Sequence, residues 1–387
     1  MYMEIRNSKT EMPLFKVKGE KFIFAVQMKL QGKCRVVGEN RMEKIKLTDI
    51  CNPKQWKTIP TSELLEDGYP VYGANGIIGY YSEFNHKNPV ITVTCRGATC
   101  GTINITVPKS YVTGNAMCLD DVRSDIYMEY LYYCLKHYNF NNVISGSAQP
   151  QITRQGMEKI YVTIGSHNEQ MDIVDKLKKV ENVIGLKKQE LKQLDTFVKS
   201  RFVELFGDPI KNPKGWEVVK LSECLERIDN GKSFTCDSNA REGVFPAILK
   251  LSAATYGDYR PYENKALLDE KQFVESVEVH RGDLLFTRKN TPDLVGMAAY
   301  VFETPEKLMM PDLIFRLVTN ERMTPTFLWQ LINNREFRPA IQGISGGSAK
   351  SMSNISKERL KNIEVICPPI SEQKKLEGVL EQVDKSK

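Results

Sequence analysis

A set of polar and aromatic side chains lies in turn-rich segments of both halves of the chain, where these groups could contact DNA. Arginine and lysine form paired hydrogen bonds with guanine, and asparagine and glutamine do so with adenine. The candidates are Tyr72, Asn75, Arg96, Gln149, Gln151 and Arg154 in the first half, and Lys232, Lys250, Arg288, Lys289, Asn290, Lys350 and Asn354 in the second. We expect Arg154 and the lysines other than Lys232 to contact phosphates, and Arg288 and the amides to contact bases. Each residue alone is more often a solvent-exposed loop residue than a DNA contact, so the prediction rests on their grouping in glycine-containing loops at matched points of the two halves.

Two glycine-containing segments have the wrong form for nucleotide binding. Residues 226–233 end in Gly231-Lys232-Ser233, as a phosphate-binding loop does, but they begin with Glu226, where that loop requires glycine. Gly73, Gly76 and Gly79 do not have the spacing of a dinucleotide-binding turn, and they lie among predicted strands. We interpret them as turn glycines that allow a close approach of the backbone to a ligand.

The sequence shows no arrangement of residues that predicts catalysis or metal binding. Cys95 and Cys100 lack a second cysteine or histidine pair at the spacing of zinc ligands, and the four histidines are scattered along the chain. Asp293 and Asp312 each follow a proline, as in some nucleases, but no acidic-x-lysine pair follows at a useful spacing. We therefore expect no catalytic residue, no metal and no cofactor.

The elements that would position these side chains are duplicated. Residues 46–50 (KLTDI) return as residues 220–224 (KLSEC), 174 positions later, and from Ile152 onward the offset is 203, so the second copy holds 29 more residues. Strand-like runs ended by turns occupy 70–76 and 89–94 in the first copy, and 247–251, 283–287, 297–302 and 314–318 in the second. Apolar residues that share one face predict helices over 128–136 and 326–333.

A long helix is predicted between the copies, over residues 169–206, and Gly207-Asp208-Pro209 ends it. Its heptad a and d positions are mostly apolar, and the first three recur in phase at the C-terminal end of the sequence. The residues expected to pair the two helices are Ile173, Leu177, Val180, Ile184, Leu191, Leu194, Val198, Leu376, Leu380 and Val383. The central helix would be about 57 Å long, which exceeds one turn of DNA, about 34 Å.

Charge and cysteine usage limit the kinds of partner and compartment. Of the net charge of +6, residues 1–41 contribute +5, and each copy is neutral. DNA binding would therefore depend on local basic patches and shaped loops rather than on a general positive field. Nine scattered cysteines, with neither a signal peptide nor a long apolar run, favour a protein of the reducing cytoplasm without membrane association.

The repeat and its loops resemble the specificity subunit of Type I restriction–modification systems. Residues 71–81 (VYGANGIIGYY) are similar to the opening, and residues 146–152 (GSAQPQI) to the closing loop, of one common class of target-recognition domain. Residues 247–252, 282–290, 344–349 and 353–356 resemble a second class. The resemblance extends over about 42–387, and the whole arrangement is more specific than any single motif.

The resemblance implies an α/β (α+β) fold, in which long antiparallel coiled-coil helices separate two β-rich target-recognition domains related by a pseudo-twofold repeat. The implied parts are an atypical N-terminal extension (1–41), a first recognition domain (42–165), a central spacer helix (166–213), a second recognition domain (214–369) and a truncated C-terminal spacer helix (370–387). Such a subunit is non-catalytic, reads a bipartite, asymmetric target in double-stranded DNA, and docks two methyltransferase subunits and the restriction–translocase subunits. The methyl-transfer site would lie on another chain.

Two features depart from the family pattern. Residues 1–41 have no counterpart in the repeat, and the C-terminal helix ends about 22 residues before the position that matches Phe206. We therefore expect a shortened helix pair. The alternative from another class is a protein-interaction scaffold that does not bind DNA, which the neutral charge of both copies favours. A stand-alone restriction enzyme would need a catalytic cluster that the sequence does not show.

Overall fold

The computed structural model describes residues 42–74, 76–146, 149–346 and 352–386. The chain divides into two compact units between Leu186 and Lys187. The predictions for residues 1–41, Asn75 and Lys350 fall outside the described residues. Among the helices of the described ranges, none is both long and apolar enough to cross a membrane.

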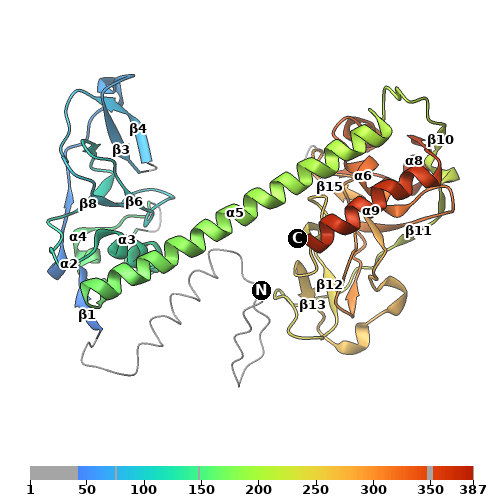
Figure 1. Cartoon of the computed structure of the whole chain (residues 1–387). Helices are drawn as coiled ribbons and strands as arrows, with labels where there is room; N and C mark the ends of the chain where they lie inside the picture. Colours follow the sequence, from blue (N-terminus) through green and yellow to red (C-terminus); the bar gives the residue numbers. More distant parts are fainter. Residues whose placement is uncertain (1–41, 75, 147–148, 347–351, 387) are drawn as a thin grey trace. The chain divides into compact units, whose positions relative to one another are not determined.

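The first unit contains a four-stranded sheet of order β2-β8-β5-β6 and a three-stranded sheet of order β4-β3-β7 (Figure 1). Its strands are β1 (Glu43–Lys46), β2 (Asn52–Gln55), β3 (Tyr69–Gly73), β4 (Gly76–Tyr81), β5 (Ile91–Thr94), β6 (Ile103–Ile105), β7 (Tyr111–Val112), β8 (Ala116–Asp120) and β9 (Tyr161–Ile164). Its helices are α2 (Leu47–Ile50), α3 (Met128–Lys136) and α4 (Arg154–Met157), with short 3-10 turns η1 (Thr61–Glu63) and η2 (Phe140–Asn142). Strand β5, which lies inside the four-stranded sheet, is buried along its whole length and forms the centre of the core.

The second unit contains a four-stranded sheet of order β11-β18-β14-β16 and a three-stranded sheet of order β13-β12-β17. Its strands are β10 (Val218–Lys220), β11 (Leu225–Asn230), β12 (Ala247–Leu249), β13 (Asn264–Ala266), β14 (Leu284–Thr287), β15 (Lys289–Asn290), β16 (Ala298–Tyr300), β17 (Leu308–Met309), β18 (Ile314–Thr319), β19 (Ser353–Asn354) and β20 (Glu364–Ile366). Its helices are α6 (Pro325–Asn333), α7 (Arg338–Gly343), α8 (Lys357–Lys361) and α9 (Ile370–Ser386), with 3-10 turns η3 (Leu221–Glu223), η4 (Leu251–Ala253), η5 (Glu270–Gln272) and η6 (Glu275–Val277).

The two units have the same topology, which confirms the duplication expected from the sequence. Both sheets match strand for strand, and in each unit the first strand pairs antiparallel with the last, β1 with β9 and β10 with β20. Equivalent backbone bonds follow these pairs: the Leu47 amide donates to the Ile160 carbonyl at 2.9 Å, and the Leu221 amide to the Ile363 carbonyl at 2.8 Å. The fold is mixed α/β, as predicted.

The predicted helices of the two copies are confirmed. Helix α3 has the predicted bounds, and α6 begins one residue early, at Pro325. Proline is favoured at the first helical position because its missing N–H would have no partner there. The Thr324 hydroxyl caps this helix by accepting from the Phe327 amide at 3.2 Å.

A buried glutamine ties the first turn of each long helix to its own unit. Helix α5 (His167–Phe206) and helix α9 carry these glutamines at equivalent positions, Gln170 and Gln373, which are 1% and 0% exposed. Gln170 accepts from the Tyr127 amide at 2.7 Å and donates to the Asp125 and Gly165 carbonyls at 2.9 and 3.0 Å. Gln373 makes the same three bonds to Thr324, Arg322 and Pro368 at 2.8, 2.9 and 2.7 Å. Each amide is thus fully used by backbone groups that would otherwise be unpaired.

The residues predicted to pair the two long helices are divided between two cores. Ile173 and Leu177 are buried in the first unit, where Val180 and Ile184 pack beside them. In the second unit, Val198 shares a core with Leu376, Leu380 and Val383 of α9, and Leu194 packs against it. There, Figure 1 shows α9 running in the opposite direction to α5. Leu191 is 39% exposed, so it does not belong to a buried seam.

The division follows the elements on which the two ends of α5 pack. Ile173 and Leu177 near its start lie in the first core, and Val198 near its other end packs with residues of α9. At its C-terminal end α5 is held by aromatic packing, because Phe206 and Phe202 lie 4.8 and 5.8 Å from the ring of Phe327 on α6. The pairing of α9 with the C-terminal part of α5 agrees with the shortened helix pair expected from the sequence.

Candidate nucleic-acid interface

Two loops from distant parts of the sequence meet beyond the end of the central strand in each unit. In the second unit, β15 pairs with β19 and places Lys289 opposite Asn354. In the first unit, Arg96 forms the equivalent bridge with Gln151. Four predicted residues thus form two matched pairs, each with one cationic and one amide side chain. We call these the loop pairs.

Backbone hydrogen bonds fix both loop pairs in the same way. The Ile152 amide donates to the Cys95 carbonyl at 3.0 Å, and the Ile355 amide donates to the Arg288 carbonyl at 2.8 Å. The closing loop of each unit then forms a two-bond ring, between Ser145 and Gln151 in the first and between Gly346 and Asn354 in the second. The frame is therefore made by main-chain atoms, which leaves the side chains at these positions to vary.

In the first unit the loop pair presents its side chains to solvent. Arg96, Gln149, Gln151 and Arg154 are all exposed. Arg154 begins α4, and its Nη2 donates to the Asn52 side-chain oxygen at 3.3 Å. Gly97, at φ +88°, makes the turn that follows Arg96, a conformation that favours glycine. The structure thus brings four of the six first-unit candidates to one surface region.

In the second unit an aromatic ring supports the cationic side chains. The Arg288 guanidinium lies 4.9 Å from the centre of the Phe315 ring, and its Nη2 donates to the Asn354 side-chain oxygen at 3.4 Å. Lys357, which sequence reasoning missed, places its Nζ 5.6 Å from the same ring. Arg288, Lys289 and Asn354 are half-buried. The ring restricts the Arg288 side chain, which lowers the entropy lost when it binds a ligand.

Two predicted residues are buried, and their burial argues against contact with DNA. Tyr72 is 7% exposed, and its hydroxyl accepts from the Val107 amide at 3.2 Å. Asn290 is 8% exposed, donates to the Thr255 hydroxyl at 3.2 Å and accepts from the Thr291 amide at 2.8 Å. Both polar groups are engaged inside the protein, so we interpret these residues as supports of the loops.

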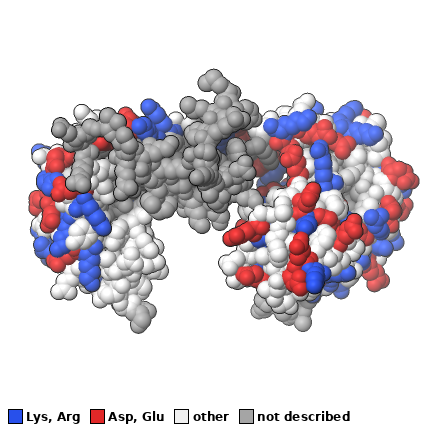
Figure 2. All heavy atoms as spheres, turned by 90° about the horizontal axis from the view of Figure 1, so that it is seen from below, with Lys and Arg blue, Asp and Glu red and all other residues white. Residues whose placement is uncertain are grey.

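Local groups, rather than an overall field, set the electrostatics. Figure 2 shows basic and acidic side chains interspersed over the surface of the second unit, in agreement with its neutral composition. Burial raises the pKa of the Cys95 thiol, which precedes Arg96, and of the Cys100 thiol. These thiols therefore stay protonated near neutral pH and are weak nucleophiles.

Comparison with known proteins identifies the family. The Type I restriction modification DNA specificity domain matches residues 39–196 and residues 213–387. The chain belongs to the family of Type I restriction–modification specificity subunits. The two matched segments correspond to the two copies of the repeat, so the resemblance inferred from the loops and helices is confirmed.

Relatives from two organisms and one solved structure agree with this family. The chain is 30% identical over 176 residues to the Type I restriction enzyme EcoEI specificity subunit of Escherichia coli. The aligned residues cover 45% of this chain and 30% of that subunit. It is 22% identical over 355 residues to the MjaVIII specificity subunit of Methanocaldococcus jannaschii, covering 84% of this chain and 81% of that one. A second M. jannaschii relative is covered over 64% of its length. The crystal structure of the M. genitalium S subunit shares the fold, with a TM-score of 0.55 at 14% identity and 92% of both chains covered.

The remaining candidates for DNA contact among the described residues, Lys232 and Lys250, lie outside the loop pairs. Lys232 is exposed and follows β11, where its amide donates to the Met310 carbonyl at 3.1 Å. Lys250 follows β12 and lies 3.9 Å from the Glu263 carboxylate, which partly compensates its charge. A phosphate contact by Lys250 would compete with this ion pair, so its predicted role is weaker than that of Lys289.

The structure also brings together three potential metal ligands that the sequence left scattered. His86 Nε2 lies 3.0 Å from Asp120 Oδ1, and Cys118 adds a thiol within 4.8 Å. Hydrogen bonds already engage the ring and the carboxylate, because His86 Nδ1 lies 2.7 Å from the Asn85 oxygen and Trp56 Nε1 donates to Asp120 Oδ2 at 3.1 Å. Burial raises the pKa of the Cys118 thiol. We therefore interpret the group as a polar network beside the small apolar cluster that contains Cys118 and Trp56.

Proposed function

We propose that this chain is the DNA-reading subunit of a Type I restriction–modification complex. Each unit would read one half of a bipartite, asymmetric target in double-stranded DNA. The observation that carries this proposal is the matched pair of loops, Arg96 with Gln151 and Lys289 with Asn354. One frame holds two different combinations of DNA-contacting side chains, which is the arrangement expected of two units that read two different sequences.

The rest of the proposal follows from the family and from the helices. Helices α5 and α9 would fix the distance between the half-sites and dock methyltransferase subunits, two in number, together with the restriction–translocase subunits. The chain itself would be non-catalytic and would act in the cytoplasm. The loop pairs support this role because they carry hydrogen-bond donors and acceptors suited to base edges rather than a nucleophile beside a base.

Methylation of a randomised DNA library by the reconstituted methyltransferase complex tests the proposal. We expect a split target, and we expect each loop pair to control one half of it. Arg96→Ala and Gln151→Ala should relax the first half alone, and Asn354→Ala the second half alone, whereas Lys289→Ala, which removes a phosphate contact, should weaken binding without changing the preferred sequence. Each lost base contact should reduce discrimination by about 1–3 kcal/mol.

Matched controls come from the opposite ends of the same strands. Lys87 precedes β5 and Arg281 precedes β14, and both are exposed. Lys87→Ala and Arg281→Ala should leave both half-sites unchanged. A library without any enriched split target would reject DNA reading and favour the scaffold alternative, whereas a change of both halves by one loop pair would reject the assignment of one unit to one half-site.

A further inference from the structure

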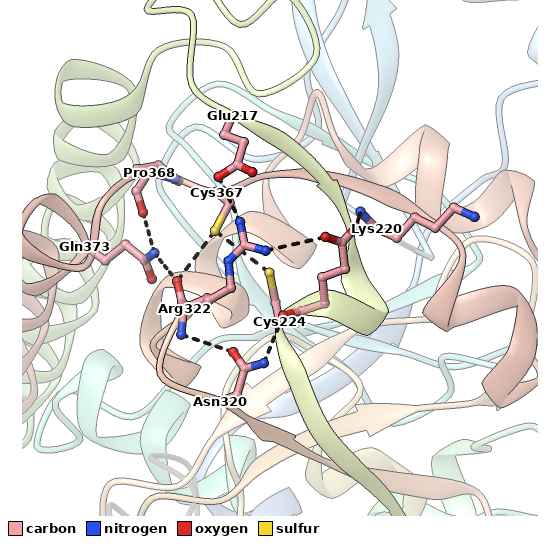
Figure 3. A network of polar contacts seen from close by, with 9 residues as sticks. Glu217, Lys220, Cys224, Asn320, Arg322, Cys367, Pro368 and Gln373 are labelled. Carbon is pink, nitrogen blue, oxygen red and sulfur yellow. Dashed lines mark hydrogen bonds and ion pairs between the residues drawn. The ribbon is translucent and has the colours of Figure 1, made fainter.

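Two buried cysteines lie next to the β10–β20 strand pair of the second unit, which we call the base of the unit. Cys224 directly precedes β11 and Cys367 directly follows β20, so they come from opposite ends of the unit, 143 residues apart. Their sulfur atoms lie 3.8 Å from each other, and the residues are 0% and 8% exposed (Figure 3). The proposed DNA-reading function does not involve this pair of cysteines.

The backbone holds each cysteine independently. The Cys224 amide donates to the Leu221 carbonyl at 3.0 Å, and the Cys224 carbonyl accepts from the Asn320 amide at 3.0 Å. The Cys367 amide donates to the Glu217 carbonyl at 2.8 Å. Because separate anchors fix the two residues, their sulfur atoms remain neighbours whenever the base of the unit is folded.

The equivalent positions of the first unit show that the fold does not require cysteine here. The matched β1–β9 and β10–β20 pairs place Ile50 at the position of Cys224 and Ile164 at the position of Cys367. Both isoleucines are buried, at 1% and 5% exposure. An apolar pair therefore fills the same space in one unit, and a thiol pair fills it in the other.

A charged network makes one thiol of the pair reactive. The Cys224 thiol donates to the Cys367 sulfur, and this bond together with the Arg322 guanidinium lowers the pKa of Cys367 to about 7. The same contact raises the pKa of Cys224. Arg322 is in turn held by Glu217 at 2.8 Å and Glu223 at 3.4 Å (Figure 3). Cys367 is thus the thiol of the pair that ionises more readily, and Cys224 is the one that stays protonated.

We propose that Cys224 and Cys367 are a redox modification site, which closes to a reversible disulfide when the chain meets a hydroperoxide. The Cys367 thiolate attacks one peroxide oxygen, so an S–O bond forms, the O–O bond breaks and hydroxide leaves. The Cys224 sulfur then attacks the sulfenic sulfur, so the S–S bond forms, the S–O bond breaks, and water leaves with the Cys224 proton. The hydroxide takes up the proton that Cys367 lost on ionising, so with hydrogen peroxide two thiols are oxidised and one peroxide is reduced to two waters.

The cross-link would act on the root of the C-terminal helix. The Arg322 carbonyl beside the thiols also accepts from Gln373, which fixes the first turn of α9. A bond between Cys224 and Cys367 would close a long loop and tie the start of the unit to the residue that leads into α9. Oxidation would therefore reduce local opening of β10 and β20.

The full chain, treated with hydrogen peroxide or with a thiol reductant, tests the site without any variant. Peptide mass spectrometry under non-reducing conditions should show a Cys224–Cys367 link that lacks two hydrogens and that the reductant removes. Hydrogen exchange at β10 and β20 should slow at least about tenfold on oxidation, whereas exchange at β1 and β9 should not change. The proposal is overturned if Cys367 is oxidised to sulfinic acid without a link, or if both cysteines remain reduced while other cysteines pair.

A variant that copies the first unit serves as the control. Cys224→Ile with Cys367→Ile should fold, because the equivalent core accepts this pair, and its exchange at β10 and β20 should not respond to peroxide. A response of the same size in the variant would assign the effect to other thiols and overturn the proposal. If the variant does not fold, the link found in the unaltered chain decides the question.

Discussion

The two units share a backbone frame but differ at the loop pairs and next to the strand pair formed by the first and last strands of each unit. The features they share depend on backbone partners: the strand order, the closing-loop rings and the bonds of Gln170 and Gln373. At the loop pairs and at the cysteine pair the difference lies in the side chains, as with Arg96 and Lys289. The comparison teaches that main-chain hydrogen bonds preserve the geometry, while side chains that make few internal bonds are free to carry different chemistry.

The largest effect should come from changing the distance between the units. One helical heptad inserted between Leu186 and Lys187 would lengthen α5 by about 10 Å, or about three base pairs at about 3.4 Å each. The preferred target should then have about three more base pairs between its halves. Because one half-site would lose its base contacts, methylation of the original target should fall more than about 100-fold.

Library methylation with and without the insertion measures this change. The exposed Lys188 provides a control of unchanged length, and Lys188→Ala should keep the original spacing. If the inserted chain still preferred the original spacing, α5 would not determine the distance between the half-sites.

The next largest effect tests whether the shared frame is equally important in both units. Gln170→Ala and Gln373→Ala each remove three buried hydrogen bonds to the backbone. Each should lower the free energy of unfolding of its own unit by about 3 kcal/mol, because buried backbone groups are left unpaired. Hydrogen exchange in urea, followed separately for the two units, measures both values.

Exposed glutamines of the two units provide the controls. Gln155→Ala in α4 and Gln382→Ala in α9 should change the free energy of their own unit by less than about 0.5 kcal/mol. A loss below about 1 kcal/mol in one unit alone would show that the frame is not used equally.

A smaller effect distinguishes buried residues that stabilise the loops from exposed residues that contact DNA. Tyr72→Phe removes only the hydroxyl that accepts from the Val107 amide. The first unit should lose about 1 kcal/mol of stability, and the target sequence should not change. Altered discrimination in the first half-site, measured by library methylation, would return Tyr72 to the set of DNA-contacting residues.

The smallest effect concerns the thiols at the base. The Cys367 thiolate fraction should rise as the pH increases through about 7, because Cys224 and Arg322 stabilise the thiolate, with Glu217 and Glu223 opposing them. Alkylation of Cys367 by iodoacetamide should therefore accelerate between about pH 6 and pH 8. Cys51 of the first unit, whose pKa burial raises to about 12, should react slowly over the same range. Equal alkylation rates at Cys51 and Cys367 would contradict the predicted difference between the pKa values of these two thiols.

The sequence predicted the features that repeat or have a regular period. The bounds of α3 follow from an apolar face with helical period, and the two copies could be aligned because residues such as Leu47 and Leu221 occupy equivalent core positions. The loop residues Arg96 and Gln151 were both predicted, but their pairing depends on strand register across 55 residues, which no local pattern encodes.

The errors share a physical cause, which is burial set by tertiary packing. Tyr72 and Asn290 stand beside turn residues and appear polar in sequence, yet their side chains point into the protein. Leu191 fits the heptad, but its side chain is 39% exposed. The approach of Cys224 to Cys367 arises only because the first and last strands of the unit pair, so neither cysteine could be singled out beforehand.

The pairing of first and last strands also has an evolutionary consequence. Because β1 meets β9 and β10 meets β20, the two ends of each unit lie together, and the chain leaves close to where it entered. Crossovers between genes at both of these strands would exchange everything between them as one cassette. If each unit reads one half-site, one such exchange would give the host a new recognition sequence without a new scaffold.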